Sequence, residues 1–330
     1  MTSTSDHRNQ PITFVGIDVS KDHLDVAFRP GGEACRLANS EAGIASLIAR
    51  LEASAPGLIV LESTGGYEKP VAVGLTGAKL PVRIVDPARA RSFAKSLGQH
   101  SKTDAIDAAV LAHFAEAVRP EARRLPDAET LELQALLDRR AQWIAMKTAE
   151  RNRLHQGPTA SVKGGLQAHV KYIEAQVVQI EKEIAARIKA HPDWGPRDSL
   201  LRSIPGVGDQ TSFALLGRLP ELGRLTGKQI AALAGLASRA RDSGTKKGER
   251  SIFGGRRQVR TSLYMAALSA SRSNITLRAM YRRLRESGKK AKVALTAVAR
   301  KLLTIANAMI RDMTPWSPNH TPVPHQKSPA

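Results

Sequence analysis

The sequence predicts an α/β domain with a mixed β-sheet at its N-terminal end, then a helical coiled-coil linker, then a mainly α-helical C-terminal domain. Three observations support this prediction. β-branched apolar segments alternate with helical patterns up to residue 118, long apolar stripes at helical spacing follow, and the last third is strongly basic. The expected boundaries are residues 12–120, 128–190 and 196–314, with residues 1–11 and 315–330 as disordered tails.

The α/β domain begins with three short segments of strand character. Each is apolar or alternating, and a Pro-Gly-Gly turn at residues 30–32 separates the second from the third. Such short connections predict an antiparallel meander. The expected strands are Thr13–Asp18, Leu24–Phe28 and Cys35–Ala38.

Helices and strands alternate after the meander. Three strands followed by helix–strand repeats predict an α/β domain of about 120 residues with a mixed sheet. The expected helices are Glu41–Ser54, 68–78, 88–97 and 104–118, and the expected strands are Leu58–Leu61 and Val82–Val85.

A linker at residues 120–127 leads to two long helical segments. They cover Ala128–Gln156 and Gly165–Ala190, and Gly157 and Pro158 separate them. Their apolar stripes predict a helical hairpin or a coiled coil. Oligomerisation, partner binding and simple spacing are all open as its role. The second stripe consists of Ile173, Val177, Ile180 and Ile184.

The charge of the chain is unevenly distributed. The 330 residues include 50 Lys and Arg against 30 Asp and Glu, a net charge of +20. Residues 1–195 carry a net charge of +2, whereas residues 196–320 carry +17. This asymmetry indicates a polyanionic partner, most often a nucleic acid. A basic solubilising surface, or binding to an anionic membrane face, is the alternative.

Other features of the composition narrow the class of protein. Cys35 is the single cysteine, which excludes an internal disulfide and a Cys-rich zinc site. No apolar run is as long as a membrane span, and the first residues do not resemble a signal peptide. We therefore expect a cytoplasmic protein with no membrane partner.

Four acidic residues of the α/β domain predict a metal site. Asp18 and Glu62 end two expected strands, while Asp104 and Asp107 begin an expected helix and share one of its faces. Strand ends in an α/β sheet converge on the crevice where ligands bind. Two Mg²⁺ ions would offset the repulsion among the four carboxylates and hold a phosphodiester between them. The alternative is that each is an ordinary surface acid.

Three further acidic residues lie on the same edge of the expected sheet. Asp22 and Asp25 are interpreted as residues of an exposed hairpin surface. Asp86 precedes Pro87 and is interpreted as a turn residue. None of the three is expected to be a metal ligand.

Residues 200–219 have the pattern of a helix-hairpin-helix motif. A Pro-Gly-Val-Gly turn separates two helical segments, and its glycines, Gly206 and Gly208, would let backbone N–H groups approach a DNA phosphate. The same motif also occurs as a simple packing unit.

Residues 239–257 form a Gly-rich and basic segment that includes Ser243. Its cations could hold a phosphodiester against the Ser243 hydroxyl, which would then act as a nucleophile. A solvated loop is the alternative, and Ser251 is a weaker candidate nucleophile. The expected nucleic-acid contacts in this segment and just after it are Arg241, Lys246, Lys247, Arg256, Arg257 and Arg260.

Five segments of the chain together resemble the IS110-family transposases, also called bridge-RNA-guided recombinases. They occur in family order over residues 14–310. The segments are FVGIDVSKDHLDVA, VLESTGGYEKPVA, DPARARSFAKSLGQHSKTDAIDAAVLA, IPGVGDQTSFALL and AGLASRARDSG with GRRQVRTSLYMAA.

The resemblance implies a specific fold and chemistry. It implies a RuvC-like domain of RNase H fold with a metal site at Asp18, Glu62, Asp104 and Asp107. It also implies that Ser243 attacks DNA and forms a covalent phosphoserine intermediate. Members of the family work as dimers that pair into tetramers, and a noncoding guide RNA base-pairs with donor and target double-stranded DNA. Asp242, directly before Ser243, departs from the family pattern.

Two other functions remain open at this point. A RuvC-like Holliday-junction nuclease would use metal-activated water, with Ser243 only as a phosphate contact. An architectural nucleic-acid-binding protein would use neither the acidic residues nor the serine for catalysis.

Overall fold

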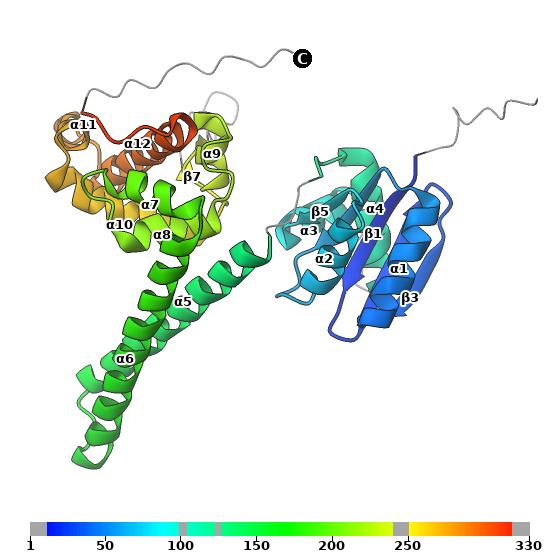
Figure 1. Ribbon diagram of the computed structural model, residues 1–330, viewed down its shortest axis with the longest axis horizontal. Helices are drawn as coiled ribbons and strands as arrows, with labels where there is room; N and C mark the ends of the chain where they lie inside the picture. Colours follow the sequence, from blue (N-terminus) through cyan, green and yellow to red (C-terminus); the bar gives the residue numbers. More distant parts are fainter. Residues whose placement is uncertain (1–11, 99–103, 123–126, 240–250, 319–330) are drawn as a thin grey trace, which may run out of the picture. The chain divides into compact units, whose positions relative to one another are not determined.

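The computed structural model describes residues 12–98, 104–122, 127–239 and 251–318 (Figure 1). It contains two compact units, residues 1–125 and 126–330, which are considered separately here. The predicted tail at residues 1–11 and most of the predicted tail at residues 315–330 lie outside the described residues.

The first unit is built on a five-stranded mixed sheet with strand order β3-β2-β1-β4-β5. β1, β2 and β3 are antiparallel neighbours, whereas β4 is parallel to β1 and β5 is parallel to β4. The predicted meander and the predicted mixed sheet are therefore confirmed. The strands are β1 (Phe14–Val19), β2 (His23–Arg29), β3 (Ala34–Ala38), β4 (Leu58–Glu62) and β5 (Val82–Val85).

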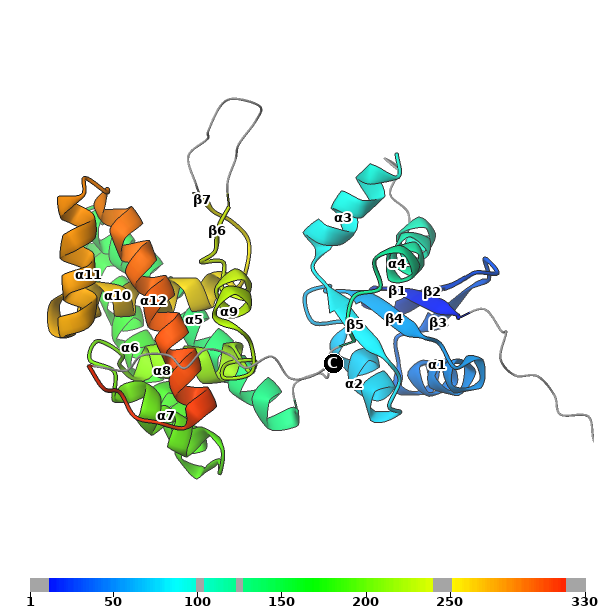
Figure 2. The same ribbon diagram turned by 90° about the horizontal axis from the view of Figure 1, so that it is seen from above.

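Helices cover both faces of this sheet, as Figure 2 shows. One face packs against α1 and α2 through residues such as Ile17 and Leu61. The other face packs against α3 and α4 through residues such as Phe14 and Val60. The helices are α1 (Glu41–Ser54), α2 (Lys69–Gly77), α3 (Pro87–Ser96) and α4 (Asp104–Val118).

The second unit begins with two long antiparallel helices, α5 (Ala128–His155) and α6 (Ala160–Ala190). The predicted apolar stripe of α6 is buried, and Ile188 extends it. Ion pairs between the helices follow the antiparallel arrangement and have N–O distances of 2.6 Å. They join Arg140 to Glu181, Arg151 to Glu174 and Arg187 to Glu132.

Shorter helices complete the second unit around one hydrophobic core. This core extends from Leu133 and Leu137 of α5 to Met309 of α12. Between α9 and α10 the chain forms a two-stranded sheet of β6 (Ser238–Arg239) and β7 (Ser251–Ile252). The helices are α7 (Trp194–Arg202), α8 (Asp209–Arg218), α9 (Gly227–Leu233), α10 (Arg257–Ser273), α11 (Ile275–Glu286) and α12 (Ala291–Asp312).

Among the described helices, α12 is long and apolar enough to cross a membrane by length and composition. In the structure, 67% of its most apolar window is buried within the helical unit. A core helix of a helical protein has this property, because it is surrounded by other helices rather than by water. The sequence analysis, which found no apolar run as long as a membrane span, did not single out this helix.

Candidate active site

Asp18 and Glu62 lie side by side on two neighbouring parallel strands. Asp18 is near the end of β1, and Glu62 is the last residue of β4. The register pairs Ile17 with Leu61, so the next step along both strands sets Asp18 beside Glu62. Side chains at paired positions project from the same face of a sheet. The two carboxylates therefore share one face.

That face is the one covered by α4. Gly16 lies two residues before Asp18 and so faces the same side. A Cβ atom added to Gly16 would lie 2.2 Å from the carbonyl oxygen of Ala108 and 2.2 Å from the amide nitrogen of Ala112. The missing side chain thus lets the helix backbone rest directly on β1.

The direction of α4 determines what lies over the end of β1. Arg119, just after the helix, lies over the ring of Phe14 at 5.2 Å from its centroid. The contact with Gly16 involves an earlier part of the helix. α4 therefore runs antiparallel to β1, and its first turn, with Asp104 and Asp107, approaches the carboxyl end of the strand.

Not all of the predicted metal site is visible in the structure. Asp18, Glu62 and Asp107 are half-buried, and each already interacts with another group of the protein. The side chain of Asp104 lies outside those that the structure describes. Among the described side chains, no group of three or more His, Cys, Asp or Glu residues is arranged to hold a metal ion. The four-carboxylate site therefore stays a prediction.

Asp25 of β2 is a further carboxylate on this face, and the expectation that it lies on an exposed hairpin surface is wrong. It is the antiparallel partner of Asp18, and only 7% of the residue is exposed. Arg36 of β3 donates to its two carboxylate oxygens, from Nε at 2.8 Å and from Nη2 at 3.1 Å. α4 covers this side of the hairpin, since Ala27 packs against it two residues further on.

The other two acidic residues on this edge agree with their interpretation. Asp22 is exposed in the turn between β1 and β2. Asp86 is exposed and caps α3, where its side chain accepts a hydrogen bond of 2.8 Å from the amide of Ala88.

A loop held by Glu68 follows Glu62. The Glu68 carboxylate is buried and accepts hydrogen bonds from the backbone amides of Thr64, at 3.1 Å, and Gly66, at 2.8 Å. Asn39 donates to the carbonyl oxygens of Ser20 and Tyr67 and so ties this loop to the end of β1. The sequence analysis did not identify Glu68. Its one sequence signal is an acidic residue at the first position of a predicted helix, 68–78.

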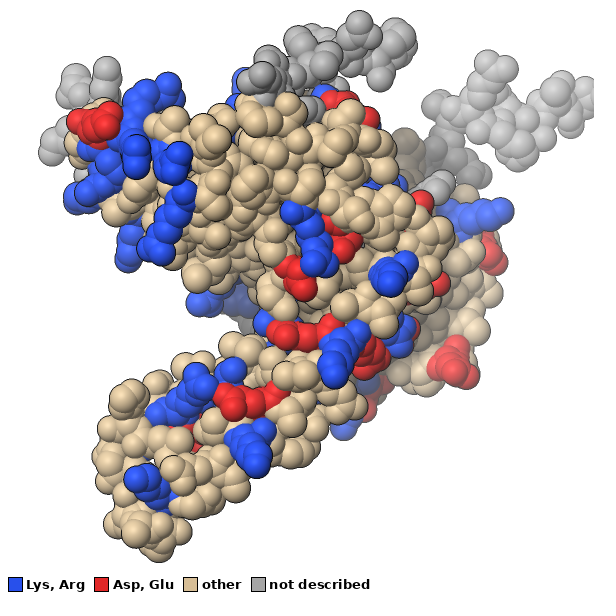
Figure 3. Space-filling view, turned by 60° about the vertical axis from the view of Figure 1, so that its left-hand side comes forward, with Lys and Arg blue, Asp and Glu red and all other residues tan. Residues whose placement is uncertain are grey.

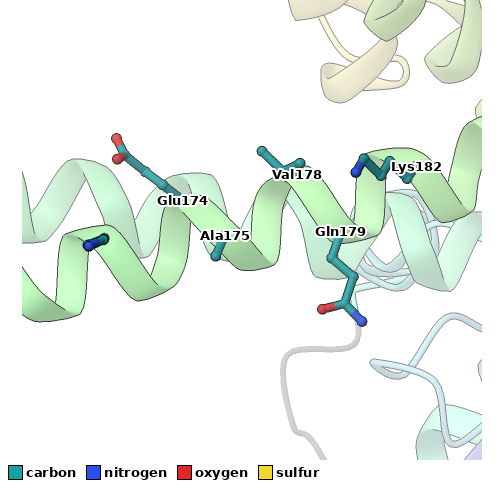
Figure 4. Close-up of a pocket in the computed structure, with 6 residues that line it drawn as sticks. Glu174, Ala175, Val178, Gln179 and Lys182 are labelled. Carbon is teal, nitrogen blue, oxygen red and sulfur yellow. The ribbon is translucent and has the colours of Figure 1, made fainter.

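Two hollows on the surface of the described residues differ in what lines them. One, of about 240 Å³, lies beside the Asp25–Arg36 pair and also touches Ala108 of α4. The other, of about 460 Å³, is lined only by α6, from Lys171 to Lys182 (Figure 4). Its side chains extend from a single helix and do not converge, so it is a groove on a helix surface rather than a ligand site.

The predicted helix-hairpin-helix consists of α7, α8 and the turn between them. Gly206 has a φ of 101°, and an added Cβ would lie 2.5 Å from the Cα atom of Ala270 in α10. Gly206 is therefore required for packing. Space around Gly208 is open, but Asp209, in the first turn of α8, pairs with Arg202 at 2.9 Å. The turn therefore has a structural role in this unit: it packs on α10 and its ion pair joins α7 to α8.

The predicted nucleic-acid contacts of the third region differ in their surroundings. Arg256 is bound within the protein, because its guanidinium donates to both carboxylate oxygens of Glu221, at 2.5 and 2.7 Å. Arg260 donates to the carbonyl oxygen of Gly254 at 2.5 Å. Arg257 is exposed. The remaining predicted residues, Arg241, Ser243, Lys246 and Lys247, lie outside the described residues.

The most basic described surface extends from the end of α10 over α11 to the start of α12, and we call it the α11 patch. Figure 3 shows Lys and Arg side chains gathered on this part of the helical unit. Glu286 is the one acidic residue between 272 and 292, and the patch arginines have no ion pair with a described carboxylate. The sequence analysis counted this charge but missed its location. The patch consists of Arg272, Arg278, Arg282, Arg283, Arg285, Lys289, Lys290 and Lys292.

Comparison with known proteins relates both units to mobile DNA elements. Residues 15–157 match a family model of the DEDD transposases of the IS110 type, described as a transposase. Residues 198–282 match the model of the IS116/IS110/IS902 family of transposases. Together the two models cover about two thirds of the chain.

Individual relatives extend this similarity over nearly the whole length. Pilin gene-inverting proteins of Moraxella bovis and Moraxella lacunata are 29% identical over 314 residues, which cover 92% of this chain and 97% of each relative. A 43.6 kDa protein of insertion element IS110 from Streptomyces coelicolor is 34% identical over 137 residues, or 41% of this chain and 33% of that protein.

Proposed function

Because this chain belongs to the IS110 family of transposases, we propose that it is a DNA recombinase with a metal-bound carboxylate site and a serine nucleophile. One observation carries the proposal. Asp18 and Glu62 lie side by side on the face covered by α4, and the first turn of that helix contains Asp104 and Asp107. The fold of this unit would be RuvC-like, since a mixed sheet between two helical layers is compatible with an RNase H fold.

Asp18, Glu62, Asp104 and Asp107 would hold two Mg²⁺ ions. The donor set fits this role, since all four are carboxylates and Mg²⁺ prefers oxygen ligands. When bound, the ions supply positive charge that stabilises a phosphodiester during strand cleavage. The protein contributes rigid placement, because two ligands are on paired strands and two are on a helix packed against them without an intervening side chain.

Ser243 would be the nucleophile. Its Oγ attacks the scissile phosphorus, an O–P bond to the serine forms, and the bond to the 3′ oxygen breaks. The serine gives up its hydroxyl proton, and the released 3′ oxygen takes up a proton. The energy of the phosphodiester is thus kept in the phosphoserine for rejoining to another strand. Asp242 and the cations Arg241, Lys246 and Lys247 are its sequence neighbours.

The partners we propose are double-stranded donor and target DNA and a noncoding guide RNA. The Moraxella relatives are described as pilin gene-inverting proteins, and the inversion of a gene is a reaction on DNA. The α11 patch, with Arg257, offers to a phosphate backbone cations that form no ion pair with a carboxylate of the described residues. We further propose a cytoplasmic homo-oligomer, a dimer that pairs into a tetramer.

A denaturing gel tests the chemistry. Wild-type protein, guide RNA and end-labelled donor and target DNA are incubated with Mg²⁺, beside Ser243→Ala and Asp104→Ala. We expect a slow, protease-sensitive DNA band with the wild type and its loss in both variants. Ser251→Ala is the matched control, because Ser251 is an exposed serine at the other end of the same segment, and it should retain the band.

Two other results would contradict the proposal. Cleaved DNA without an adduct, formed equally by wild type and Ser243→Ala, would indicate a Holliday-junction type nuclease that uses water. Binding of DNA without cleavage, unchanged in Asp104→Ala, would indicate an architectural protein.

A further inference from the structure

Arg36, Asp25, Asp18 and Glu62 occupy successive positions across four neighbouring strands. The register pairs Arg36 with Asp25 and Asp25 with Asp18, and it sets Asp18 beside Glu62. Since paired positions share a face, all four side chains lie on the α4 side of the sheet. The row thus contains three carboxylates and one guanidinium.

Arg36 and Asp25, at one end of this row, form a bidentate ion pair. Arg36 binds both oxygens of Asp25, at 2.8 and 3.1 Å, which is the bidentate geometry of a strong arginine–carboxylate pair. Only 7% of Asp25 is exposed, whereas 55% of the Arg36 side chain is exposed. Both oxygens of Asp25 are therefore already occupied.

The pair also reaches the helix that carries the other two acids. The residues that line the hollow beside it include Asp25, Arg36 and Ala108, and Ala108 directly follows Asp107 in α4. A charge change at Asp25 or Arg36 is consequently close to Asp18 across the sheet and to the start of α4 above it.

We propose that Arg36 and Asp25 are positioning residues of the divalent-cation site: their bidentate pair compensates the charge of Asp25 beside Asp18 and keeps the Asp25 carboxylate out of the ligand set. This inference rests on the proposed function, because it assumes that Asp18 binds a divalent cation. It goes further in that it names residues which set the affinity of the site without binding the metal.

The two single substitutions have opposite effects under this proposal. Asp25→Asn removes one negative charge beside Asp18 and keeps the positive charge of Arg36, so the affinity for a divalent cation falls. Arg36→Met leaves an additional carboxylate beside Asp18, so the affinity rises. A unit charge near a divalent ion in a partly solvated site changes affinity by about fivefold. The double variant Asp25→Asn/Arg36→Met has no net change of charge and returns to the wild-type affinity.

The test is Mn²⁺ binding to the full-length protein without nucleic acid, followed by electron paramagnetic resonance of the free ion. We expect weaker binding by Asp25→Asn, tighter binding by Arg36→Met and near wild-type binding by the double variant. Arg36→Lys retains the charge and should bind as the wild type does. A merely structural pair would change stability but would not produce opposite shifts in affinity.

The control variant changes a charge of the same unit outside the row of Arg36, Asp25, Asp18 and Glu62. Glu33→Gln removes one partner of an exposed ion pair with Arg50 in the same unit and should leave Mn²⁺ binding unchanged. Equal affinities in all variants, or weakening in both single variants, would overturn the inference. Thermal unfolding of each variant verifies that it is folded. If Asp18→Ala binds Mn²⁺ as well as the wild type does, the metal site of the proposed function fails instead.

Discussion

At the scale of single residues, Gly16 determines how closely α4 approaches the sheet. A Cβ at this position would meet backbone atoms of the helix at 2.2 Å, and backbone cannot move aside as a flexible side chain can. The helix with Asp104 and Asp107 would have to lift from the strand with Asp18. Stability and the acidic face therefore depend on the same residue.

We predict that Gly16→Ala destabilises the first unit by about 3 kcal/mol or more, because overpacking against backbone is costly. Urea denaturation of the full chain measures this. Gly77→Ala is the control, since a Cβ there meets nothing within 4 Å, and its effect should be small. A loss below about 1 kcal/mol for Gly16→Ala would show that α4 moves easily.

Residue-scale predictions from the sequence were most accurate where a residue type has a strong local preference. Asp86 is such a case: the sequence predicts a turn residue before Pro87, and Asp86 is exposed at the start of α3, where it also caps the helix. Asp25 was misinterpreted because its burial comes from α4, which is about 80 residues away in the sequence. Glu68 was missed because an acidic residue at the start of a predicted helix is common, and its partners are backbone amides of the preceding loop, which the sequence pattern does not mark.

At the scale of elements, the strands and helices of the first unit agree with the sequence prediction to within a few residues. Period-2 and period-3.6 patterns and turn residues suffice there. The predicted start of the second long helix, at Gly165, is wrong, since α6 begins at Ala160. Gly164 and Gly165 argue locally against a helix, but packing against α5 overrides this preference. The two-residue strands β6 and β7 were not predicted, because only their mutual pairing defines them.

Asp127 is the element-scale determinant of where α5 begins. Its carboxylate accepts a hydrogen bond of 2.7 Å from the amide of Thr130, and this bond lowers the pKa of Asp127 below its usual 3.8. A carboxyl group with a lowered pKa stabilises the folded state above its unfolded pKa, and this contribution is lost as the pH falls through the folded pKa.

We therefore predict that Asp127→Ala costs about 1 kcal/mol at neutral pH, the usual value of a helix cap. The difference from wild type should be constant above about pH 5 and shrink as the pH falls below 3.8. Denaturation at a series of pH values measures it. Asp127→Asn, which caps without charge, should keep most of the stability at all pH values. A cost that does not depend on pH would contradict the assigned role of the charge.

The α11 patch is an element-scale feature with a salt-dependent consequence. Each phosphate neutralised on duplex DNA contributes about 0.9 to the slope of log affinity against log salt. We predict that Arg282→Gln/Arg283→Gln lowers this slope by about two and weakens binding independently of sequence. Fluorescence anisotropy at several salt concentrations measures both.

Arg151→Gln/Arg153→Gln on α5 is the matched control for the patch. It removes the same charge, but both arginines are paired with carboxylates, Glu174 and Glu150. An equal fall in slope for both double variants would mean that total charge, and not the α11 patch, governs binding.

At the scale of the whole molecule, each unit closes its own hydrophobic core. The first unit buries two layers of side chains against its sheet, and the second buries one continuous core from α5 to α12. We predict two calorimetric transitions. Leu61→Ala should lower the temperature of only one transition and Leu302→Ala that of only the other. Each substitution removes a fully buried leucine and should reduce the free energy of unfolding of its unit by about 2–5 kcal/mol. A single transition that both variants lower together would contradict this.

The two separate cores also have a genetic consequence. An exchange of gene segments at the boundary between residues 125 and 126 leaves the interior of each half intact, so chimaeras of distant relatives joined there should fold. An exchange between α5 and α6 instead divides one core between two parental sequences, and its leucines and isoleucines would have to match by chance. Recombination between related genes can therefore exchange the two units as wholes, provided that the junction lies before α5 and not after it.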